Sequence, residues 1–178
     1  MNQNLLASTI KAILSDNEED FFEGINLNSV QRGWGFITES DLTPVEGYYA
    51  CYITVFSPSN KSQEPVSVNS RMPPTKSEYS VKIHMADLAE VELGEENPYE
   101  TASRQFRTVL NRIANYFTDN DVGSGFKLRR GRTEDRVVEA NDLSGSFKDV
   151  EGNEFPGLYA EIDFQVEDWC ESDTARRE

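Results

Sequence analysis

The segment that most constrains the fold is residues 97–117, NPYETASRQFRTVLNRIANYF, because its apolar residues are spaced as one face of a helix. These apolar residues are Tyr99, Ala102, Phe106, Val109, Leu110, Ile113, Ala114 and Phe117. Asn97 can cap the first turn, and Pro98 suits the first helical position, where a missing N–H costs nothing. The pattern predicts one long amphipathic helix that must lie across an apolar surface.

Alternating segments predict the strands that supply this surface. Tyr48–Phe56 is apolar or aromatic on both faces, as in a central strand. Later in the chain, apolar and polar residues alternate along Glu78–Met85, which predicts a second strand. The polar stretch between them contains four prolines, so we expect a long β-hairpin with an extended loop or arm at 57–78. In the last predicted strand, 158–166, one side is apolar and the other is polar, which is typical of an antiparallel sheet.

The other elements are less regular. Asn2–Leu14 has the stripe of an amphipathic helix, which we expect the acidic run after it to end. An irregular stretch follows, with one short strand at Trp34–Ile37 and several glycines. From Phe126 we expect a basic strand, or two short ones, broken at Gly131 and near Asn141.

Strands and helices do not alternate here as they do in parallel crossovers, so the sequence predicts an α+β fold. We expect an antiparallel sheet packed by the long helix and the N-terminal helix. The 178 residues suffice for one core, so we predict a single domain over 1–170 and a disordered tail over 171–178. No apolar run approaches the ~20 residues of a membrane span, and the first residues lack the pattern of a signal peptide.

The residues that most often carry chemistry are few and scattered. His84 is the single histidine, and its strand face also carries Ser80 and Lys82, which predicts a solvated position without a catalytic partner. Cys51 and Cys170 lie at no metal-ligand spacing, and we interpret them as ordinary small residues. We therefore expect no catalytic residue, no cofactor and no enzymatic activity.

Two further patterns have a functional and a structural interpretation. The carboxylates of the last strand, Glu161, Asp163 and Glu167, with Asp168 after them, have the alternate spacing that can hold magnesium, but any solvated strand face has it too. Trp34 lies between two glycines and is either a recognition tip or a plug at the edge of the core. In both cases we favour the structural interpretation, and we expect no metal site.

The charge of the chain is distributed unevenly. The net charge is −15, which argues against a surface built to grip nucleic acid. Residues 104–136 nevertheless carry eight basic and four acidic side chains, an excess of +4 that leaves −19 elsewhere. A basic patch on an acidic molecule can pair head to tail with other copies around a ring, although a solvated charge pattern is the commoner explanation. The arginines that we expect in a subunit or partner interface are Arg104, Arg107, Arg112, Arg129, Arg130 and Arg132.

The order of the predicted elements resembles that of a known family, the tail terminator (tail completion) proteins of long-tailed bacteriophages. The resemblance rests on the N-terminal helix MNQNLLASTIKAIL, the hairpin strands GYYACYITVF and EYSVKIHM, the helix after NPYETASRQF, and the closing strand LYAEIDFQVED. The chain is longer than many members, and residues 16–46 have no clear counterpart.

The resemblance implies a structural virion protein at the phage neck, made in the host cytoplasm. It would form a homohexameric ring that joins the tail tube protein to a head-connector protein, with DNA passing through and not bound specifically. Two alternatives stay open from the residues. One is an acidic DNA mimic or another phage interaction protein, and the other is a metal-dependent hydrolase that uses Glu161 and Asp163.

Overall fold

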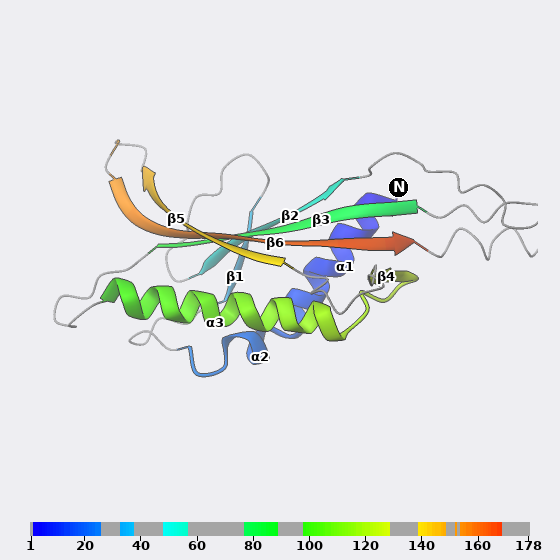
Figure 1. The fold of residues 1–178 in the computed structure, drawn as a ribbon, viewed down its shortest axis with the longest axis horizontal. Coiled ribbons are helices and arrows are strands. Elements are labelled where there is room, and N and C mark those ends of the chain that lie inside the picture. The colour runs from blue at the N-terminus through cyan, green and yellow to red at the C-terminus, as the bar shows by residue number, and fades with distance from the viewer. Residues whose placement is uncertain are drawn as a thin grey trace, which may run out of the picture.

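The computed structural model describes residues 2–25, 33–37, 48–56, 77–88, 98–128, 139–148, 152 and 154–168. Within these ranges lie three helices and six strands (Figure 1). In chain order they are α1 (Asn2–Asp16), α2 (Glu18–Phe22), β1 (Trp34–Phe36), β2 (Tyr49–Phe56), β3 (Ser77–Leu88), α3 (Pro98–Asp119), β4 (Phe126–Leu128), β5 (Glu139–Lys148) and β6 (Glu154–Asp168).

The described strands form one mixed sheet in the order β1-β2-β3-β6-β4, with β5 also paired to β6. Strand β6 pairs with β3 along one edge, and its other edge is shared by β5 at 154–163 and β4 at 166–168. The α+β fold class is thus confirmed. The expectation of a wholly antiparallel sheet is wrong at one edge, because the short strand β1 pairs parallel to β2.

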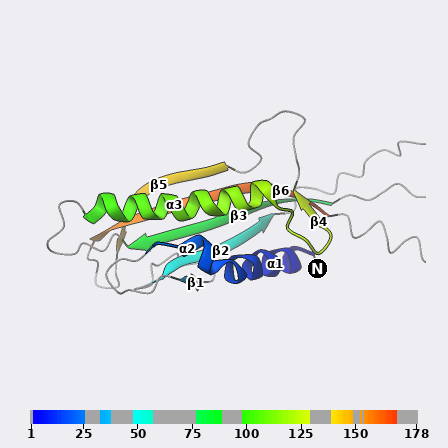
Figure 2. The same cartoon turned by 90° about the horizontal axis from the view of Figure 1, so that it is seen from below.

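The molecule has two layers, with the helices on one face of the sheet (Figure 1). Helix α1 contacts β2, helix α3 contacts β5 and β6, and α2 contacts both of the longer helices. Figure 2 shows all three helices on the near side of the strands. One face of the sheet is therefore apolar and buried, and none of the described helices covers the other.

The core lies between α3 and the middle of the sheet. Phe106, Ile113 and Phe117 of α3 are fully buried. The Phe117 ring stacks on Phe164 of β6, with 4.8 Å between centroids, and Phe106 contacts the buried ring of Tyr49 in β2. This packing matches the spacing of apolar residues in the sequence. Among the described side chains of α3, the buried ones are Phe106, Val109, Leu110, Ile113, Ala114 and Phe117; the side chains of Tyr99 and Ala102 lie outside the described part.

Trp34 plugs the corner between the first helices and strand β1, as the structural interpretation predicted. Its indole Nε1 donates a hydrogen bond to the carbonyl of Leu14 at 2.9 Å, and its backbone N–H donates to Glu18 Oε1 at 2.8 Å. A Cβ on Gly33 would lie 2.6 Å from Glu18 Oε1, so a larger residue there would displace the end of the Glu18 side chain, which accepts this hydrogen bond. The Trp34 ring also packs against Phe22, with centroids 4.8 Å apart.

Three details differ from the sequence-based expectations. The acidic run after α1 opens a second short helix, α2, in which Phe21 and Phe22 are buried and three acidic residues occupy the favourable first turn. Strand β5 continues through Asn141, because all ten of its residues pair with residues of β6. Strand β6 begins at Glu154 and not near 158. Pro156 lies one residue beyond the last β3 pair, at Gly157, and pairs with Ser146 of β5.

Several predictions fall outside the described residues. The proposed arm at 57–78 lies there except for its last two residues, which belong to β3. The same holds for the predicted tail at 171–178, for Cys170, and for the capping residue Asn97. Helix α3 does begin at Pro98, as the sequence indicates.

The burial of α3 generates the first prediction. Leu110→Ala and Ile113→Ala should each lower the free energy of unfolding by about 2–5 kcal/mol, since each removes a buried large aliphatic side chain. Asn111→Ala, at an exposed position between them, is the control and should cost little. Urea midpoints of the three variants test this, and equal midpoints would show that the buried face is assigned wrongly.

The Trp34 corner generates the second prediction. Glu18→Ala removes the carboxylate that accepts the Trp34 N–H, and should cost about 1–3 kcal/mol because that donor is partly buried. Glu19→Ala changes the exposed neighbour and should leave stability nearly unchanged. Thermal unfolding of both variants is the measurement. A Glu19 variant as unstable as the Glu18 variant would point to the helix dipole and not to this hydrogen bond.

Candidate functional site

The candidate site is the face of the sheet that the described helices leave uncovered, which we call the polar face. Side chains alternate along each strand, so the residues between the buried ones point to this side. Strand β2 contributes Tyr52, Thr54 and Phe56; β3 contributes Glu78, Ser80, Lys82 and His84; β6 contributes Tyr159, Glu161, Asp163, Gln165 and Glu167; and β4 contributes Lys127.

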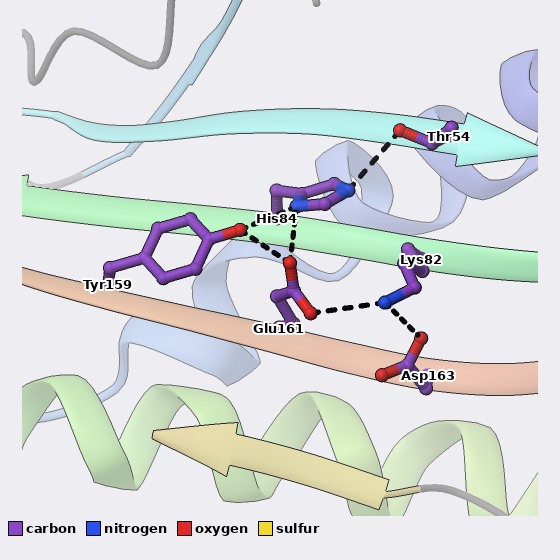
Figure 3. Close-up of polar contacts among 6 residues, drawn as sticks. All are labelled: Thr54, Lys82, His84, Tyr159, Glu161 and Asp163. Atoms are coloured by element: carbon purple, nitrogen blue, oxygen red, sulfur yellow. Dashed lines mark hydrogen bonds and ion pairs between the residues drawn. The ribbon is translucent and has the colours of Figure 1, made fainter. Parts of the chain in front are cut away.

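Strand register brings the polar residues into two neighbouring rows. Tyr52, His84 and Glu161 lie opposite one another on β2, β3 and β6. Thr54, Lys82 and Asp163 form the next row. Directly opposite and diagonal side chains on a sheet lie within contact distance, so groups about 80 residues apart in sequence form one network (Figure 3).

His84 is the centre of this network. Its ring stacks on Tyr52, with centroids 4.1 Å apart and planes at 9°. Its Nδ1 lies 2.8 Å from the Tyr159 hydroxyl and 3.2 Å from Glu161 Oε1, and its Nε2 lies 3.2 Å from Thr54 Oγ1. The Tyr159 hydroxyl donates its hydrogen to Glu161 at 2.6 Å, so its oxygen accepts from His84 and the proton is assigned to Nδ1.

These contacts change what the histidine can do. Only 7% of His84 is exposed, so the expectation of a solvated position is wrong. It failed because the sequence does not show that Tyr52 covers the ring. With Nδ1 on Tyr159 and Nε2 on Thr54, both ring nitrogens have partners inside the chain. The arrangement suits a residue that holds neighbouring strands in register better than a general base.

Glu161 and Tyr159 shift each other's titration. The hydrogen bond from Tyr159 lowers the pKa of the Glu161 carboxyl, assisted by the ammonium of Lys82 and opposed by partial burial. The pKa of Tyr159 is raised, first by burial and then by its hydrogen bond to Glu161. Glu161 is therefore held as a carboxylate and Tyr159 as a neutral phenol at neutral pH.

Lys82 occupies the space between the two carboxylates of β6. Its Nζ lies 3.2 Å from Glu161 Oε2 and 3.4 Å from Asp163 Oδ1 (Figure 3). The hydrogen bond to Glu161 and the charge of Asp163 raise the pKa of Lys82. The ammonium thus neutralises part of the negative charge that a bound cation would need.

The carboxylates of β6 do not all share one face. Glu161, Asp163 and Glu167 belong to the polar face, whereas Asp168 is turned to the helix-covered side, where 1% of it is exposed. Among the described residues, no group of three or more histidine, cysteine or acidic side chains could hold a metal ion. Of the two cysteines, Cys51 is a free, buried thiol whose pKa burial raises to about 12.

The arginines expected at an interface have different environments. Arg104 and Arg107 are exposed on the outer side of α3, away from the sheet. Arg112 is partly buried, and its guanidinium donates to the backbone carbonyls of Phe21 at 2.9 Å and Glu23 at 2.8 Å, which ties the end of α2 to α3. Arg129, Arg130 and Arg132 lie outside the described residues.

A shallow groove of about 260 Å³ lies between α1 and the strands β1 and β2. Its lining includes Lys11 and Phe36, and the Lys11 Nζ sits 4.8 Å from the centre of the Phe36 ring. The groove is smaller than typical ligand pockets, which run from about 300 Å³ upward. The polar face is therefore the stronger candidate for function.

No family model matches the chain, and no curated protein matches it at a significant level. Within the described part of the chain, none of the helices has both the length and the apolar character needed to span a membrane.

The polar network generates the third prediction. Because Glu161 has a lowered pKa in the folded protein, its stabilising contribution is present above the usual value of 4.5 and is lost as pH falls through the folded-state pKa. Tyr159→Phe removes the main cause of this shift. The variant should be less stable than the parent at neutral pH, and the difference should narrow toward pH 3.

Urea midpoints between about pH 3 and pH 7 measure this difference, and Tyr48→Phe supplies the matched control. Tyr48 is 46% exposed, so loss of its hydroxyl should matter little at any pH. A Tyr159→Phe deficit that stays constant over the whole range would mean that the hydroxyl does not stabilise the ionised form of Glu161.

Proposed function

We propose that this protein is a ring-forming tail terminator at the neck of a long-tailed bacteriophage. Six copies form a ring that sits on the tail tube protein and meets a head-connector protein. In this role the chain acts by assembly, without catalysis and without a cofactor. The protein is made in the host cytoplasm and becomes part of the virion.

The arrangement of the elements is the observation that carries this proposal. The N-terminal helix, the antiparallel pair β2 and β3, the long helix α3 and the closing strand β6 follow one another in the order on which the family resemblance rests. Helices α1 and α3 pack on the same face of one sheet. Among the described elements, this arrangement leaves the opposite sheet face and the outer side of α3 as surfaces for contacts with other subunits.

The charge of the chain is consistent with a ring through which DNA passes. A channel lined by carboxylates repels phosphates, so the duplex does not adhere, whereas a basic channel would trap it. With a net charge of −15, the chain has carboxylates for such a lining. The basic surface of α3 then faces a neighbouring protein and not the channel.

A second candidate function is favoured by the same net charge. An acidic protein can imitate DNA and occupy the nucleic-acid site of a partner, provided that carboxylates run along one continuous surface. The excess of +4 over residues 104–136 interrupts such a surface, so we place this function second. A DNA mimic acts as a monomer or dimer bound to a basic protein, which the same experiment distinguishes.

The fourth prediction is tested by solution mass and electron microscopy, with and without tube protein. The chain alone or with tube protein should give a particle of six copies of the 20.2 kDa chain, seen as a ring with a central channel. The ring should cap tubes at one end. A chain that stays monomeric and never associates with tube or connector protein would contradict the proposed function.

A further inference from the structure

The two surfaces that the described helices and strands leave uncovered lie on opposite sides of the molecule. The polar face is one side of the sheet, and α3 packs on the other side with its outer surface turned away from the strands (Figures 1 and 2). A contact that joins these two surfaces cannot be made within one chain. It can be made between two copies, with the polar face of one against the helix of the next.

The polar face has the chemistry that binds arginine. Its described residues include four carboxylates, on Glu78, Glu161, Asp163 and Glu167, against two ammonium groups, on Lys82 and Lys127, an excess of two negative charges. It also has one exposed aromatic ring, because Phe56, opposite Ser80 of β3, is 51% exposed. Carboxylates beside aromatic rings favour a guanidinium, which pairs with the first and stacks on the second.

The outer side of α3 has the complementary chemistry. From Ser103 to Thr118 the helix contains three arginines and no acidic residue. Arg112 is turned toward the carbonyls of α2, whereas Arg104 and Arg107 are exposed residues of this surface. The two arginines are three residues apart, so they project from adjacent positions on one side of the helix.

We propose that the polar face of one copy binds the α3 arginines of the next copy, and that this contact builds the ring. The inference rests on the proposed function and identifies the surfaces that form its subunit interface. The partner is a second copy because the chain itself carries both complementary surfaces. Such a contact is heterologous, so each copy offers its polar face to one neighbour and its helix to the other, and the assembly closes when the rotation between neighbours permits it.

Charge reversal on each surface tests this contact, and is the fifth prediction. In the face variant, Glu78→Lys and Glu167→Lys reverse two carboxylates outside the His84 network. In the helix variant, Arg104→Glu and Arg107→Glu reverse the two exposed arginines. Each variant alone places like charges at every interface and should weaken self-association by about ten-fold or more.

Restoration of assembly is the decisive readout. An equimolar mixture of the two variants should assemble again when the two kinds of copy alternate. The lysines on the polar face of the face variant then meet the glutamates on α3 of the helix variant, and the remaining contacts join a native polar face to a native α3. The chain that carries all four substitutions should also assemble. The control carries Asp16→Lys and Glu19→Lys, which make the same charge change as the face variant at exposed positions that belong neither to the polar face nor to α3.

Sedimentation velocity of each protein, alone and with tube protein, gives the result, with urea midpoints to verify folding. The proposed contact is overturned if the face variant and the helix variant both assemble normally, or if the control is impaired as much as they are. In either case a ring formed by the parent chain would still support the proposed function. If the helix variant forms rings but no longer binds the tube protein, the α3 arginines contact the tube protein and not the next copy. This result would also overturn the proposed contact between copies. Failure of the parent chain to assemble in any condition would instead overturn the proposed function.

Discussion

The structure depends on the burial of one face of the sheet under the helices. Burial of apolar side chains is the main favourable term in folding, and here it is concentrated between α3 and strands β2, β3 and β6. Ile83, Ile162 and Phe117 are among the fully or almost fully buried side chains of this layer. Once that side of the sheet is buried, strand alternation leaves the intervening residues on the other side.

The polar network exists because the other face of the sheet is buried, and the network in turn constrains the register of the strands. A shift of one residue in the register of β6 would turn its apolar residues away from α3. The same register places Glu161 beside His84 and Asp163 beside Lys82. The network is therefore compatible with a single pairing of the strands. Its energetic contribution is smaller than that of the core, because Lys82, Glu161 and Asp163 keep part of their surface in water.

The short elements complete the burial at the ends of the sheet. Strand β1 is held at the edge by Glu18, Leu14 and the ring of Phe22, so that α1 and α2 close one corner of the core. Arg112 connects this corner to α3 through the carbonyls at the end of α2. One of the six arginines of the predicted interface thus has a structural role within the chain, and the exposed charge of α3 is smaller than the sequence suggests.

Local periodicity in the sequence was sufficient for the α+β class, the strand β2, the buried positions of α3, and the alternation of β6. Each of these depends on the spacing of apolar residues within one element, and that spacing determines which side of the element is buried. The prediction that β2 is a central strand was wrong, because it lies beside the short edge strand β1 and has one face that none of the described helices covers. The parallel pairing of β1, the short helix α2 and the length of β6 depend on partners distant in the chain, so only the tertiary structure decided them. The same is true of His84. Its strand neighbours are polar, and it is buried only because β2 and β6 bring Tyr52 and Tyr159 against its ring.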